Sequence, residues 1–184
     1  MGKLIYYYMR QALQDEINET FDQLAEVFSA FGSDQIDIVP FEGSWTAGQV
    51  GEHVMRSLSN IQAFLNGDTS ATSRPYDEKS AILRNAFLDF NSKMQSPDFI
   101  LPRETIHSKE RLLKSFDDAR QQMLQIAGTS DLTVTCNSFE MPGLGFLTRM
   151  EWLTFYIVHT RRHVHQLNNI RRALEAKGLA LEKK

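Results

Sequence analysis

Residues 148–174 read TRMEWLTFYIVHTRRHVHQLNNIRRAL, and this stretch organises the interpretation of the whole chain. Its apolar residues recur at the three- and four-residue steps of an amphipathic α-helix. Thr148 and Glu151 form a T-x-x-E capping box where the helix is expected to begin. His159 and His163 are four residues apart, so one helical turn places both rings on the same face. That spacing allows two imidazoles to bind one metal ion.

The rotation of about 100° per residue separates the three histidines of this stretch. With His159 at zero, His163 falls near 40°, inside the apolar stripe that contains Trp152 and Leu167. His165 falls near 240° and is expected to be a solvated surface residue. Two inward imidazoles without partners are costly to bury, and a shared metal would satisfy both. The alternative is a pair of buried histidines with a structural role, because H-x-x-x-H also arises by chance.

A third ligand must come from another part of the chain, and His53 is the candidate. In the helix expected to begin at Thr46, His53 lies at the edge of the buried face. This position suits a metal ligand at the rim of a cleft, and it equally suits a histidine without function at the boundary of the core. His107 lies in an expected loop without a paired ligand and is left out of the site. Position 160 is Thr160 where zincin-type proteases have the glutamate of H-E-x-x-H, so that class is disfavoured.

The remaining pattern predicts an all-α fold in a single domain, residues 1–184. Gly48 and Gly51 would weaken the helix that begins at Thr46, so they suggest close packing there. Residues 132–136 alternate like a strand but have no evident partner, and we expect an ordered loop. Helices are expected at about residues 4–31, 46–66, 77–94, 108–127 and 148–175, which gives an up-down four-helix bundle with an accessory helix in a long crossover.

The composition excludes several functional classes. The chain has 184 residues and a net charge of −3, without the basic surface expected of a nucleic-acid-binding protein. Its one cysteine, Cys136, cannot form an internal disulfide and is interpreted as a small filler residue. The sequence shows neither a signal peptide nor an apolar run long enough to cross a bilayer. We therefore expect a soluble cytoplasmic protein that binds neither nucleic acid nor membrane.

Two segments together resemble the DinB/YfiT-like family of metalloenzymes: SWTAGQVGEH at residues 44–53 and EWLTFYIVHTRRHVHQ at residues 151–166. The resemblance implies the bundle fold described above, often as a homodimer. It also implies a divalent metal, commonly zinc or nickel, held by His53, His159 and His163. Family members include transferases and isomerases that use low-molecular-weight thiols, so a thiol cosubstrate and a small-molecule substrate are implied as well.

Three neutral imidazole ligands would leave a position on the metal for water or a thiolate, whose pKa the metal would lower. The leading hypothesis is a metal-dependent enzyme that activates a thiol for S-transfer. A metal-dependent hydrolase and a non-catalytic metal- or small-molecule-binding bundle are the alternatives. Helix geometry places four side chains where they could orient the imidazoles: Gln49, Ser57, Tyr156 and Thr160. Arg162 and Gln166 lie beside the histidine pair and could contact an anionic substrate; the equal alternative is that both are solvated residues of the helix surface. Glu52 could act as a general base.

Overall fold

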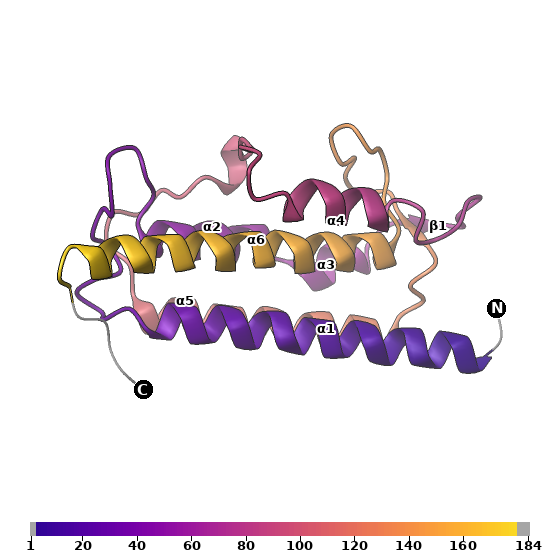
Figure 1. Cartoon of the computed structure of the whole chain (residues 1–184). Coiled ribbons are helices and arrows are strands. Elements are labelled where there is room, and N and C mark those ends of the chain that lie inside the picture. Colours follow the sequence, from indigo (N-terminus) through magenta and orange to yellow (C-terminus); the bar gives the residue numbers. More distant parts are fainter. Residues whose placement is uncertain (1–2, 180–184) are drawn as a thin grey trace.

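The computed structural model describes residues 3–179 and shows a four-helix bundle with an accessory helix (Figure 1). The helices are α1 (Lys3–Ser29), α2 (Ala47–Ser57), α3 (Ile61–Leu65), α4 (Ser80–Leu88), α5 (Lys109–Thr129) and α6 (Arg149–Ala176), with a short 3-10 helix, η1 (Asp98–Ile100). Two short strands, β1 (Thr69–Ser70) and β2 (Thr135–Cys136), pair in antiparallel fashion. No helix within residues 3–179 is long and apolar enough to cross a membrane.

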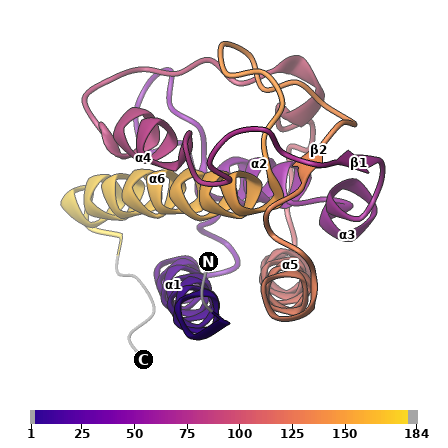
Figure 2. The same cartoon turned by 90° about the vertical axis from the view of Figure 1, so that its right-hand side faces the viewer.

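The helices are arranged so that α1 packs against α5 and α6, and α2 packs against α6 and α5. The consecutive helices α1 and α2 therefore lie on a diagonal of the bundle (Figure 2). In Figure 1, α1 and α6 run in one direction, whereas α2 and α5 run in the other. The crossover, residues 89–108, carries the chain back to the end where α2 began, which is why α2 and α5 are parallel. It passes beside the face that α2 and α6 share.

The predicted apolar stripe of α1 forms one side of the core. Every member of the stripe is buried. These residues are Leu13, Ile17, Phe21, Leu24, Phe28 and Phe31. Burial of such side chains supplies the main stabilisation of a bundle of this size, since helices of this length are marginal in isolation. The accessory helix α4 packs on the outer side of α6. Glu16 of α1 forms ion pairs with Arg84 of α4 (2.6 Å) and Arg161 of α6 (2.8 Å), and these pairs link the three helices.

The structure corrects three predicted elements. The helix predicted for residues 46–66 is divided in two: α2 ends at Ser57, and Asn60, whose backbone is left-handed (φ 59°), is the residue from which α3 starts. The accessory helix is shorter than predicted and ends at Leu88. The segment 132–136 was predicted to lack a strand partner, and this was wrong: Cys136 pairs with Thr69. Both predicted capping boxes, which open α2 and α6, are confirmed.

The close packing predicted at Gly48 and Gly51 is present. A Cβ on Gly48 would lie 2.5 Å from both Asp37 Oδ1 and His107 Nδ1. These two atoms are themselves hydrogen-bonded at 2.5 Å, so neither can move aside independently. A Cβ on Gly51 would lie 2.9 Å from the ring of Phe28. The glycines thus allow the crossover and α1 to approach the first turns of α2.

Gly48→Ala is expected to destabilise the protein by about 1–3 kcal/mol, because the added methyl group forces Asp37 and His107 apart. Gly128→Ala is the matched control. Gly128 is an exposed residue inside α5, where a Cβ would meet only the end of the Gln14 side chain at 3.1 Å. That substitution is expected to stabilise by about 0.5–1 kcal/mol. Urea unfolding of both variants measures the difference; equal effects would contradict the packing argument.

Candidate metal centre

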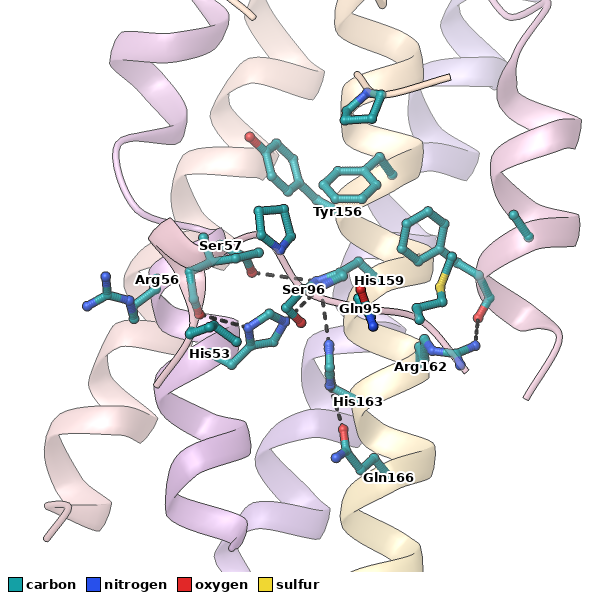
Figure 3. A pocket seen from close by; sticks show the side chains of 18 of the residues that line it. His53, Arg56, Ser57, Gln95, Ser96, Tyr156, His159, Arg162, His163 and Gln166 are labelled. Carbon is teal, nitrogen blue, oxygen red and sulfur yellow. Dashed lines mark hydrogen bonds between the residues drawn. The ribbon is translucent and has the colours of Figure 1, made fainter. Parts of the chain in front are cut away.

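The three histidines singled out from the sequence lie together between α2 and α6. His53 Nε2 is 3.2 Å from His159 Nε2, and His163 Nε2 is 3.1 Å from the same atom. One nitrogen of each ring lies within 4.8 Å of the others, and all three residues are buried. Figure 3 shows the rings of His159 and His163 on successive turns of α6, facing His53 on α2. The predicted juxtaposition of two helices and three imidazoles is therefore present.

The second ring nitrogen of each histidine is held by another group. His53 Nδ1 donates to the carbonyl oxygen of Ile100 (2.9 Å), and His163 Nδ1 donates to Gln166 Oε1 (2.9 Å). Ser57 Oγ donates its proton to the carbonyl of Val54, so it accepts from His159 Nδ1 at 3.5 Å. A neutral imidazole carries one N–H, and each of these contacts assigns it to Nδ1. All three Nε2 atoms are then lone-pair acceptors.

This arrangement fits a divalent metal ion. Three acceptor nitrogens that face one another have no hydrogen to share, and a cation at the centre of the group would satisfy all three. Zinc–nitrogen bonds of about 2.0–2.1 Å place two ligands on one tetrahedral ion roughly 3.3 Å apart, close to the observed nitrogen–nitrogen separations. Hydrogen bonds to the far ring nitrogens are the usual means by which proteins orient metal-binding histidines.

The environment keeps the imidazoles neutral. Burial lowers the pKa of His163 to about 3, with the neighbouring His53 adding to the effect. Burial likewise lowers the pKa of His159 well below its ordinary value, and the His163 and His53 rings lower it further. The pKa of His53 is lowered by burial, which outweighs the opposite effect of the Ile100 carbonyl. Protons therefore do not compete for the three nitrogens near neutral pH.

The histidines open onto a cleft of about 1870 Å³. It is bounded by α2, α3, α4, α6, the crossover, and loop 137–147, the segment between β2 and α6. Aromatic rings surround the imidazoles: Trp45 lies 5.2 Å from His53 between ring centroids, and Phe155 lies 5.4 Å from His159. Such a site is open on one side to small molecules and screened from bulk water on the other.

Several of the other proposed site residues have different roles in the structure. Gln49 completes the α2 capping box with Thr46, and Thr160 is buried outside the cleft. Arg162 donates to the carbonyl oxygens of Phe87 and Asp89 (3.2 and 2.9 Å), so it anchors the start of the crossover rather than presenting a free charge. Of the four predicted orienting residues, Ser57 is the one that forms a hydrogen bond with a histidine ring.

Glu52 does not face the histidines as a general base would. Its Oε2 accepts from the backbone N–H groups of Arg103 and Glu104 (2.9 and 3.0 Å) and lies 3.2 Å from His107 Nε2. Burial raises the pKa of Glu52, but these hydrogen bonds and His107 lower it below its usual value overall. His107, predicted to have no partner ligand, is buried between Glu52 and Asp37. This cluster fastens the crossover to α2.

Two further residues differ from expectation. His165 was predicted to be a solvated surface residue, but it is half-buried and stacks on Phe90 with ring centroids 4.1 Å apart. Gln166 was proposed as a substrate contact, yet it orients His163. Its position three residues after His163 on the same helix was sufficient to predict that the two side chains are neighbours. The carbonyl of Ile100 had no sequence signal, because any residue at that position of the crossover supplies the same atom.

Comparisons with known proteins agree with this architecture. No curated protein sequence matches the chain. The solved structure of YfiT from Bacillus subtilis, described as a probable metal-dependent hydrolase with an unusual four-helix bundle topology, superposes with a TM-score of 0.58 and 17% sequence identity. The match covers 95% of this chain and 90% of that one. The sequence model of the DinB superfamily matches residues 16–167, so the chain belongs to the DinB superfamily.

Proposed function

We propose that the protein is a divalent-metal-dependent enzyme in which His53, His159 and His163 bind the metal, zinc or nickel. Its reaction is the transfer of a low-molecular-weight thiol to an electrophilic small molecule. The observation that carries the proposal is the convergence of three neutral Nε2 atoms at the wall of an open cleft. A divalent ion on three neutral ligands supplies Lewis-acid chemistry and lowers the pKa of a bound thiol or water.

The protein's own residues prepare this site. Ile100, Ser57 and Gln166 fix the N–H of each imidazole at Nδ1, which leaves Nε2 free for the metal. The aromatic residues around the rings exclude water and lower the local dielectric, which strengthens electrostatic interactions. Three protein ligands, rather than four, are typical of catalytic zinc sites. The same feature argues against a purely structural metal.

Hydrolysis is the second candidate, because water and a thiol would use the same position. The observation that favours it is the fold shared with YfiT, which is described as a probable metal-dependent hydrolase. The ligand set does not distinguish the two reactions. The difference lies in whether turnover requires a thiol.

The test uses untagged protein that is stripped of metal and reloaded with zinc or nickel. Conjugation of 1-chloro-2,4-dinitrobenzene to a panel of low-molecular-weight thiols is measured beside thiol-free cleavage of 4-nitrophenyl acetate. We expect conjugation above the uncatalysed rate with the reloaded protein and none with the stripped protein. Ester cleavage without a thiol would favour the hydrolase instead. Reloaded protein that neither conjugates any of the thiols nor cleaves the ester would count against both candidate functions.

A further inference from the structure

The cleft beside the histidines is predominantly aromatic, and part of that aromatic surface is exposed to solvent. Phe139 in loop 137–147 lies 6.1 Å between ring centroids from both Phe99 of η1 and Trp152 of α6. Phe64 packs edge-on against Trp152, with ring centroids 4.8 Å apart. Phe99 and Phe139 both line the cleft and remain 57% and 37% exposed. Large aromatic rings left exposed at the mouth of a cleft are typical of a binding site for an apolar molecule.

Both arginines that line the cleft donate hydrogen bonds to backbone carbonyls of the crossover. Arg162 is engaged by backbone carbonyls, and Arg56 donates to the carbonyl of Phe99 (2.7 Å) and points away from the histidines in Figure 3. Lys93 and Asp98, both exposed on the crossover, have opposite charges. Arg162 forms no ion pair within residues 3–179, so its positive charge stays close to His159 and His163.

Two uncharged polar side chains of the crossover complete the site. Gln95 and Ser96 line the cleft, and in Figure 3 their side chains project toward the histidines. Neither side chain makes a hydrogen bond with another residue in the range 3–179. The Gln95 amide and the Ser96 hydroxyl can each donate as well as accept a hydrogen bond. With the positive charge of Arg162 nearby, they suit a ligand group that accepts hydrogen bonds. A carbonyl group is the simplest such acceptor.

We propose that the cleft binds aromatic carbonyl compounds, with the aromatic body against Phe139, Phe99 and Trp152 and the carbonyl beneath Gln95 and Ser96. The inference names the substrate class of the proposed enzyme and rests on that function only in placing the reacting group at the histidines. Aromatic contacts of this kind hold the body of the ligand through dispersion and edge-to-face packing. The polar contacts set its orientation.

The test measures binding of 2-acetonaphthone to metal-free protein through quenching of tryptophan fluorescence. Trp45 and Trp152 both line the cleft and report directly on occupancy. Phe139→Ala is expected to weaken binding about tenfold. Phe146→Ala is the matched control: Phe146 lies in the same loop and is 42% exposed, but it does not line the cleft. We expect less than about a twofold change for this control.

Gln95→Ala tests the polar half of the site. It is expected to weaken binding of 2-acetonaphthone about fivefold, in line with the loss of one hydrogen bond. Acetone, which has the carbonyl without the aromatic body, is expected to cause no saturable quenching over the same concentration range. Equal affinities of the Phe139→Ala and Phe146→Ala variants, or absence of saturable binding by wild-type protein, would overturn the proposal.

The binding results can be distinguished from a failure of the proposed enzymatic function. Metal-dependent turnover together with equal affinities of the two phenylalanine variants would remove the aromatic specificity and leave the enzyme assignment intact. Selective weakening by Phe139→Ala without any metal-dependent turnover would leave the ligand class intact and remove the enzyme assignment.

Discussion

His159→Ala is expected to eliminate tight metal binding. Wild-type protein purified without a tag should contain about one divalent ion per chain, and the variant should bind at least about 100-fold more weakly. The reason is geometric: His159 Nε2 is the atom to which both other imidazoles are close, at 3.2 and 3.1 Å. Its loss leaves His53 and His163 on different helices without the nitrogen that completes the group. Elemental analysis and zinc titration measure the effect.

His165→Ala is the control for this experiment. It removes an imidazole from the same helix, two residues beyond His163, but leaves the three converging nitrogens in place. We expect metal content equal to that of the wild type. Both variants should be folded, since helix formation does not depend on either ring, and circular dichroism checks this. Retention of one tightly bound ion in His159→Ala would refute the ligand assignment.

Arg74→Ala is expected to produce the largest loss of stability. The Glu151 side chain has no exposure, and Arg74 contacts both of its carboxylate oxygens at 2.6 Å. The carboxylate also accepts from the backbone N–H groups of Thr148 and Lys79 (2.9 and 2.8 Å). Without Arg74, a buried negative charge would lack its counterion, which costs about 3–5 kcal/mol. Urea unfolding at pH 7 measures the difference in free energy of unfolding.

Arg111→Ala provides a matched comparison at the surface. Arg111 pairs with Glu104, and the two side chains are 50% and 39% exposed, so loss of this pair should cost less than about 1 kcal/mol. An effect of Arg74→Ala no larger than that of Arg111→Ala would show that the buried pair contributes little. Because both variants remove an arginine, the comparison isolates burial from the change in net charge.

The Arg74 effect should also depend on pH. Burial alone would raise the pKa of Glu151, but Arg74 and the Thr148 and Lys79 N–H groups lower it below its ordinary value. A lowered pKa stabilises the folded state above the unfolded-state pKa of about 4.3, and this contribution is lost as the pH falls through the folded-state pKa. The difference between wild type and Arg74→Ala should therefore shrink in acid. A difference that grows below pH 4 would contradict this assignment.

The helical pattern was sufficient to identify most of the fold because burial follows local periodicity. The stripe from Leu13 to Phe31 and the capping boxes at Thr46 and Thr148 each depend on residues within one or two turns. The division between α2 and α3 was missed because Asn60 takes a left-handed conformation that asparagine tolerates but does not require. The β1–β2 pair was missed because its strands are far apart in the sequence.

The candidate site likewise combines features that follow from local helix geometry with features that depend on long-range contacts. The sequence by itself determined that His159 and His163 share one face of α6, since helix geometry fixes the positions of residues four apart. It also offered His53 as the candidate third ligand, and the resemblance to a known family named the same residue. Only the tertiary structure decided which atoms orient the rings and which side chains cover them. The Ile100 carbonyl, Gln95 and Ser96 belong to an irregular crossover, whose position depends on the long-range contacts of Glu52 and His107 and not on any local period.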